Sequence, residues 1–166
     1  MDRCYLLLEK IALLSEKVND SEIEFVCSDC FETIANCKCN NHNYSSIIDI
    51  DKDIYPAIKR LNQLGYKTKF CCQGHINNGT IQAYIYFSND SKTEMLPTLP
   101  DNWQYESYKY AGVFKYRYNI IRSNIPFSRY KLSKLTDKEK QEYIQNNIQS
   151  LNEWVENLPL RSEIVE

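Results

Sequence analysis

The stretch CSDCFETIANCKC, residues 27–39, decides how part of this chain folds. It holds four of the seven cysteines of the 166-residue sequence, Cys27, Cys30, Cys37 and Cys39. Four thiolates at this spacing can close a tetrahedron around one Zn²⁺, and a Cys-x2-Cys pair answered by a second close pair is a specific arrangement. We therefore predict that zinc is bound here as a cofactor, with ordinary buried thiols as the alternative.

The surrounding residues favour a small zinc ribbon. IEFV (23–26) and FETIAN (31–36) are two short predicted strands, each running into one cysteine pair. Because Cys-x-Cys is a less usual half-site than Cys-x2-Cys, His42 could replace Cys37 or Cys39. Protein would fill all four positions in either case, so the ion would be structural rather than catalytic.

The remaining patterns predict an α+β protein, with a small mixed or antiparallel sheet flanked by helices and the zinc ribbon inserted. We expect an amphipathic helix within residues 1–20, the ribbon at 21–43, a core domain at 44–160 and a tail at 161–166. Within the core domain we expect a strand at 47–50, a helix that Asp53 caps and Gly65 ends, and strands at 67–72 and 81–88.

The C-terminal part of the core domain contains two further signals. Residues 103–121 are predicted to form two strands joined by a hairpin around Ala111-Gly112. Thr136 and Glu139 have the spacing of a capping box, and an apolar stripe of helical period follows as far as Pro159. We therefore expect a long C-terminal helix that packs on the sheet.

A second cysteine motif, Cys71-Cys72-Gln73-Gly74-His75, stands where a strand is predicted to end and a loop to begin. Cys72 and His75 could form a nucleophile–base pair, or bind a second metal with Cys71 or Asp49 as a further ligand. Gly74 would allow close approach of a backbone or a phosphate. The alternative is that these cysteines pack in the core, as free cysteines often do.

Charge is distributed unevenly although the net charge is only −2. Between Ser107 and Thr136 there are seven basic residues and no acidic one. On a strand, Lys115 and Arg117 would share one face and Tyr116 and Tyr118 the other. Such a surface can bind phosphates and stack bases. We predict a binding site made by Cys72, Gly74, His75, Tyr84, Tyr86, Lys115, Arg117 and Arg122, and the alternative is a solvated strand with tyrosines packed beneath it.

Residues 47–87 carry a resemblance. The helix ending LNQLGYKT, the motif Cys72-Gln-Gly-His75 and the strand YIYF resemble a block in small uncharacterised bacterial and phage proteins, some of which also have a Cys-rich ribbon. More distantly, the sequence TKFCCQGH is similar to the Ser-Cys-Ser-Gly-Arg motif of the wybutosine-synthesis tRNA methyltransferase. His75 stands where that enzyme family has arginine, which argues against methyl transfer, and residues 88–166 have no counterpart.

These features favour a non-catalytic binding protein that recognises a nucleotide or RNA phosphate. Small proteins of this composition are often encoded by phages, so we expect interference with a bacterial defence system, as by an anti-CRISPR protein, with a host defence protein as partner. One alternative is an enzyme using Cys72 and His75, either a nucleotide hydrolase or a base-modifying transferase. Another is an adaptor that binds protein through its ribbon. Glu9 and Lys10 interrupt the first apolar run, so we expect no membrane segment and a cytoplasmic location.

Overall fold

The computed structural model describes residues 23–39, 46–76, 80–88, 96–125 and 133–163. The helix expected within residues 1–20 and the alternative ligand His42 lie outside these ranges. The chain divides into two compact units, Met1–Lys52 and Asp53–Glu166. None of the described helices is both long enough and apolar enough to cross a membrane.

The first unit contains a two-stranded antiparallel sheet. Strand β1 (Ile23–Cys27) pairs with β2 (Ile47–Asp51), with Cys27 opposite Ile47. Residues 47–50 were expected to belong to the core domain, but their strand pairs with β1 and not with the larger sheet. The segment FETIAN, expected to be the second ribbon strand, forms a turn with a single bridge between Val26 and Thr33.

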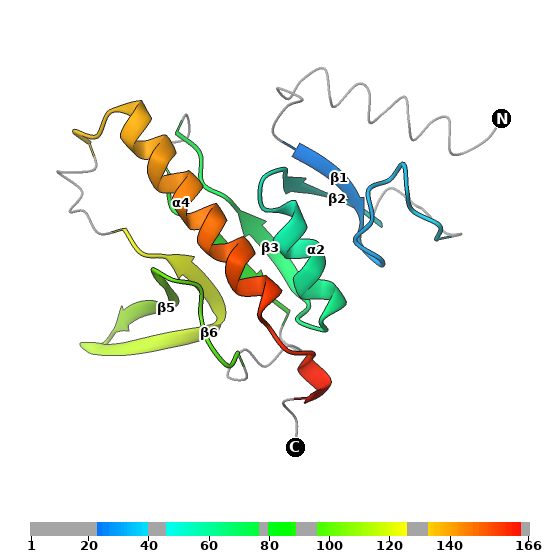
Figure 1. Cartoon of the computed structure of the whole chain (residues 1–166). Helices are drawn as coiled ribbons and strands as arrows, with labels where there is room; N and C mark the ends of the chain where they lie inside the picture. Colours follow the sequence, from blue (N-terminus) through cyan, green and yellow to red (C-terminus); the bar gives the residue numbers. More distant parts are fainter. Residues whose placement is uncertain (1–22, 40–45, 77–79, 89–95, 126–132, 164–166) are drawn as a thin grey trace. The chain divides into compact units, whose positions relative to one another are not determined.

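The second unit is an α+β arrangement around a four-stranded antiparallel sheet with strand order β3-β4-β6-β5 (Figure 1). The strands are β3 (Thr68–Cys72), β4 (Tyr84–Phe87), β5 (Trp103–Tyr110) and β6 (Val113–Ser123). The helices are α2 (Tyr55–Gln63), α4 (Asp137–Glu156) and a 3-10 turn, η3 (Arg161–Glu163). The expected fold class is therefore confirmed, with every strand pair antiparallel.

The core of this unit lies between the two helices and one face of the sheet. Period-two alternation on β4 turns Ile85 and Phe87 inward, and both are fully buried. Leu61 on α2 and Leu151 on α4 are also fully buried, and α2 packs against both α4 and β3. Burial of such side chains stabilises a fold by about 1.5–3 kcal/mol each.

Helix α2 begins without a side-chain cap. Its N-cap is Ile54 rather than the expected Asp53, with Pro56 in the first turn. The end of the helix is held instead by buried Asn62, whose amide nitrogen donates to the Ile58 carbonyl at 2.8 Å and to the Thr68 hydroxyl at 2.7 Å. Its amide oxygen accepts from the Thr68 N–H at 3.0 Å. Asn62 thereby fixes the start of β3, and Gly65 makes the turn at φ 91°.

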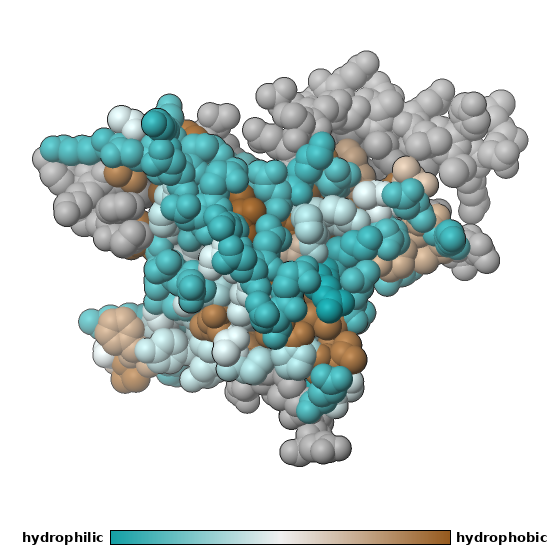
Figure 2. Space-filling view, viewed as in Figure 1, coloured by the Kyte–Doolittle hydropathy of each residue, from teal (hydrophilic) through white to brown (hydrophobic). Residues whose placement is uncertain are grey.

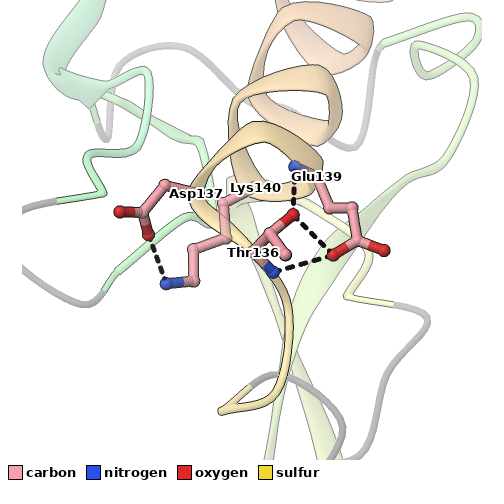
Figure 3. Close-up of polar contacts among 4 residues, drawn as sticks. All are labelled: Thr136, Asp137, Glu139 and Lys140. Atoms are coloured by element: carbon pink, nitrogen blue, oxygen red, sulfur yellow. Dashed lines mark hydrogen bonds and ion pairs between the residues drawn. The ribbon is translucent and has the colours of Figure 1, made fainter.

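The capping box of α4 forms as the sequence predicts (Figure 3). The Glu139 backbone N–H donates to the Thr136 hydroxyl oxygen at 3.3 Å, and the Thr136 N–H donates to the Glu139 carboxylate at 2.7 Å. Asp137 adds a negative charge to the first turn and pairs with Lys140 at 2.8 Å. These contacts satisfy N–H groups that a helix start would otherwise leave unpaired.

Candidate functional site

The first cysteine pair lies on a tight turn that follows β1. The Phe31 N–H donates to the Cys27 carbonyl at 2.9 Å, and the Cys27 N–H donates to the Glu32 carbonyl at 2.9 Å. Phe31 is buried and has φ 56°, a left-handed conformation that costs a bulky residue free energy. This turn reverses the chain directly after Cys30, so that the second pair returns towards the first.

The four cysteine sulfurs Cys27, Cys30, Cys37 and Cys39 all lie within 4.8 Å of one another. The Sγ atoms of Cys30 and Cys37 are 3.3 Å apart. A tetrahedral site with Zn–S distances of about 2.3 Å requires sulfurs about 3.8 Å apart, so the cluster has the dimensions of such a site. These cysteines could bind a metal such as zinc, and they would complete its coordination without His42.

Crowding of the thiols alters their ionisation. Hydrogen bonding with Cys37 and then with Cys30, together with burial, raises the pKa of the Cys39 thiol to about 12. Burial is the largest cause of the raised pKa of Cys37. Burial also acts to raise the pKa of Cys27, but hydrogen bonds from the backbone N–H groups of Cys30 and Asp29 and with the Cys37 and Cys30 side chains together outweigh it and lower that pKa. Four thiols this close cannot all ionise unless a cation balances their charge.

The Cys72–His75 loop closes the end of β3. Gly74 has φ 90°, and a Cβ there would lie 2.5 Å from the carbonyl oxygen of Ile81, so glycine is required. The His75 N–H donates to the Thr80 carbonyl at 2.8 Å. The Cys72 sulfur and a ring nitrogen of His75 lie within 4.8 Å of each other. The loop thus brings together the two side chains that the motif singled out.

Cys71 and Asp49 were the two other candidate ligands for a metal bound by this loop. Cys71 lies opposite the fully buried Ile85, so it is on the core face, whereas Cys72 lies opposite Tyr84 on the other face. Asp49 is an exposed residue of β2 in the first unit. Cys72 ends β3, the edge strand of the second unit's sheet, and His75 follows it in the loop.

The sheet face opposite the core carries most of the other predicted binding residues. We call it the aromatic–basic face and define it by Lys69, Phe70, Tyr84, Tyr86, Glu106, Tyr108, Lys115, Arg117 and Arg122. Tyr84 lies opposite Arg122 in the register, and the Arg122 guanidinium is 5.6 Å from the centre of the Tyr84 ring. Tyr86, two residues along β4, points the same way. The predicted grouping of Tyr84, Tyr86 and Arg122 is therefore present.

Lys115 and Arg117 reach the same face through an irregularity in β6. Tyr105 pairs with Ile121, but the next residue, Glu106, pairs with Arg117. In a regular strand Arg117 and Arg122, five residues apart, would point to opposite faces. The extra residues of β6 between them change the alternation, so both side chains contact the Glu106 carboxylate. Glu106 lies 2.5 Å from Arg122 and 3.6 Å from Arg117.

Glu106 is a residue of this face that the sequence did not single out. It stands just before the acid-free window and lowers the net positive charge of this surface. Its two ion pairs also fix the guanidinium groups beside aromatic rings, since Arg117 lies 4.9 Å from the centre of the Tyr108 ring. The only available signal was the position of one acid at the border of a basic, tyrosine-rich segment.

The opposite side of the β5–β6 hairpin exposes large aromatic side chains. Phe114 and Tyr116 are 67% and 57% exposed, and Figure 2 shows hydrophobic atoms gathered at this end of the hairpin. Ala111 and Gly112 form the two-residue turn with φ values of 49° and 83°, as the sequence predicts. Tyr116 and Tyr118 thus lie away from Lys115 and Arg117, as expected.

Comparison with protein-family models, curated proteins and solved structures finds no match for this chain. Its function must therefore be argued from its own residues.

Proposed function

We propose that this chain is a zinc-stabilised binding protein that recognises the phosphate of a nucleotide or RNA on the aromatic–basic face. The observation that carries the proposal is the composition of that face. Its described residues include one acid, Glu106, and four bases, Lys69, Lys115, Arg117 and Arg122. A concentration of positive charge beside aromatic rings suits phosphate contacts together with base stacking.

The arginine geometry supports this function. A guanidinium held against a ring loses less side-chain freedom on binding than a free lysine would, and it still presents N–H donors to an anion. Arg117 is more than half exposed, whereas Glu106 is largely covered. An incoming phosphate would therefore meet the guanidinium before the carboxylate.

In this proposal zinc has a structural role. The four cysteines would supply all of its ligands, which leaves no position for substrate. The metal would fold the cysteine-rich segment, and the sheet of the second unit would bind the ligand.

The test is RNA binding by a Lys115→Ala, Arg117→Ala double variant, measured by fluorescence anisotropy across a salt series. We expect weaker binding and a slope of log K against log salt that falls by about two, because each lost phosphate contact removes about one released counterion. The thermal midpoint should barely change, since exposed strand charges contribute little to stability.

A double variant with the same charge change elsewhere is the control. Lys134 and Lys138 are exposed residues that precede or begin α4, and their replacement with alanine should leave both affinity and salt slope unchanged. Equal losses in the two double variants would mean that only total charge matters. Unchanged binding in the Lys115, Arg117 variant would contradict the proposal.

A second candidate function is favoured by the proximity of Cys72 and His75, which suits a nucleophile and its base. An enzyme of this kind requires a Cys72 thiol that reacts with iodoacetamide faster than Cys71, with His75→Ala abolishing the difference. Mass spectrometry of alkylated peptides measures both rates. Equal, slow alkylation of Cys71 and Cys72 would reject the enzyme and leave the binding function standing.

A further inference from the structure

Phe70, Tyr86 and Lys69 form a cluster on the part of the aromatic–basic face that β3 and β4 contribute. The two rings are cross-strand neighbours on β3 and β4, with planes 3° apart and centroids separated by 5.9 Å. Phe70 is 56% exposed, an unusual position for a phenylalanine in a strand. The ammonium of Lys69 lies 5.7 Å from the centre of the Phe70 ring and 6.0 Å from that of Tyr86.

A bulge in β3 brings Lys69 to this face. Thr68 pairs with Phe87 and Phe70 pairs with Tyr86, so Lys69 is an extra residue with no partner position on β4. In a regular strand Lys69 and Phe70 would point to opposite faces of the sheet. The bulge re-aims the lysine, so that the charge lies over two parallel rings.

The cluster continues directly into the arginine part of the face. Tyr84 is two residues from Tyr86, about 6.6 Å along the strand, and Arg122 lies against its ring. The order across the sheet is therefore Phe70 with Tyr86, then Tyr84 with Arg122, then Glu106 with Arg117. Rings and cations therefore lie together along this path, and Glu106 is the acid among its described residues.

We propose that this path binds a single-stranded nucleic acid, with unpaired bases stacking on Phe70 and Tyr86 and with Lys69 and Arg122 contacting the adjacent phosphates. The inference rests on the proposed phosphate-binding function and adds the class of ligand. Stacking on side chains requires exposed base faces, which a duplex hides. A single strand offers both the exposed faces and closely spaced phosphates.

The test measures anisotropy of labelled oligouridine, oligothymidine and an RNA duplex, each about 12 nucleotides long, a typical site size for such proteins. We expect the wild type to bind the single strands more tightly than the duplex. Phe70→Ala should weaken single-strand binding about tenfold, since one stacked base contributes about 1–3 kcal/mol. Phe70→Trp should restore it, because the larger ring also stacks.

The chain offers a matched control for this variant. Phe114 is also an exposed phenylalanine, and the Lys109 ammonium lies 5.9 Å from the centre of its ring, but the pair is on the other side of the hairpin. Phe114→Ala should leave single-strand affinity unchanged. Lys69→Ala should lower the salt slope by about one, whereas Lys109→Ala should not change it.

The outcomes separate this inference from the function on which it rests. If Phe70→Ala binds as tightly as the wild type while the Lys115, Arg117 variant binds weakly, the stacking platform is wrong and the phosphate-binding function stands. Equal affinity for duplex and single strand, or displacement of the oligonucleotide by an equal concentration of uridine monophosphate, also overturns the single-strand assignment. A wild type that binds none of the three probes at low salt contradicts both proposals.

Discussion

The two units of this chain differ in how many apolar side chains their described residues bury. The described apolar residues that are buried in the first unit are few, chiefly Val26, Phe31 and Ile50, beside buried Cys27. The second unit buries apolar side chains from α2, α4 and three of its strands. The described residues of the first unit therefore bury little apolar area, which favours the cysteine cluster as a further source of stability there, whereas the second unit has a conventional core.

Because of this difference, we expect loss of metal to unfold the first unit and loss of core packing to destabilise the second. Thiolate ligands are not arranged in the unfolded chain, so if the four cysteines bind zinc as proposed, the free energy of metal binding would become free energy of folding in the first unit. In the second unit the stabilising term is burial of apolar area. The four experiments below test this division, from the largest expected effect to the smallest.

Replacing Cys30 with serine should have the largest effect. The variant loses one of four converging cysteines, so under the zinc proposal about one equivalent of zinc should be released and the first unit should unfold, because metal binding would supply its folding energy. Native mass spectrometry measures the zinc, and hydrogen exchange measures protection of β1 and β2.

Cys71→Ser is the control for this substitution, since Cys71 lies outside the four-cysteine cluster. It should keep the zinc. A metal-free wild type with protected β1 and β2 would show that packing alone stabilises the first unit and would remove the contrast between the units.

Leu61→Ala tests the second unit. Leu61 is fully buried on α2, and the substitution leaves a cavity, so we expect a loss of about 2–5 kcal/mol in the free energy of unfolding. Urea denaturation followed by tryptophan fluorescence measures it, because Trp103 and Trp154 both belong to this unit. Zinc content should not change. Loss of zinc in this variant would mean that the two units fold together.

The sequence predicted those features that depend on local chemistry. The cysteine spacing, the Thr136–Glu139 capping box, the Ala111-Gly112 turn and the role of Gly65 each follow from residues close together in the chain. The pairing of β2 with β1 did not follow, because a short apolar run such as residues 47–50 fits either sheet equally well. The prediction that Asp53 caps α2 was wrong. The N-cap is Ile54, which is held by burial and not by a side-chain hydrogen bond.

The candidate binding face shows a similar limit. Alternation along a strand predicted that Lys115 and Arg117 share a face, and the register confirms it. The two bulges could not be predicted from alternation, because each interrupts it. The bulge in β3 places Lys69 on the same face as Phe70. The bulge in β6 places Arg117 on the same face as Arg122, where both contact Glu106. Residues 47–87 alone therefore could not define the site, and the resemblance that they carry stays a prediction.

Gly74→Ala should have a smaller effect than a core cavity. The new Cβ meets the Ile81 carbonyl and the residue is held at φ 90°, so we expect a loss of about 1–3 kcal/mol in the free energy of unfolding of the second unit. Gly112→Ala separates the two causes, because Gly112 has φ 83° but nothing within 4 Å of a Cβ. If both variants lost the same free energy of unfolding, the whole effect would come from backbone strain, and contact of the new Cβ with the Ile81 carbonyl would add nothing.

Thr136→Ala should have the smallest effect, and that effect should depend on pH. Loss of an N-cap costs about 1 kcal/mol, measurable by urea denaturation at neutral pH.

The Thr136 side chain, and then its backbone N–H, donate to Glu139 and lower the pKa of that carboxyl. A lowered folded-state pKa means that the carboxylate contribution is fully present above the unfolded pKa, about 4.3, and is lost as pH falls through the folded pKa. The difference between wild type and Thr136→Ala should therefore shrink on acidification. Glu139→Gln removes the titrating group, so in that background the Thr136→Ala difference should not vary with pH. A difference that stayed constant in acid in the presence of Glu139 would mean that the carboxylate adds nothing to the cap, and that the Thr136 hydroxyl alone accounts for it.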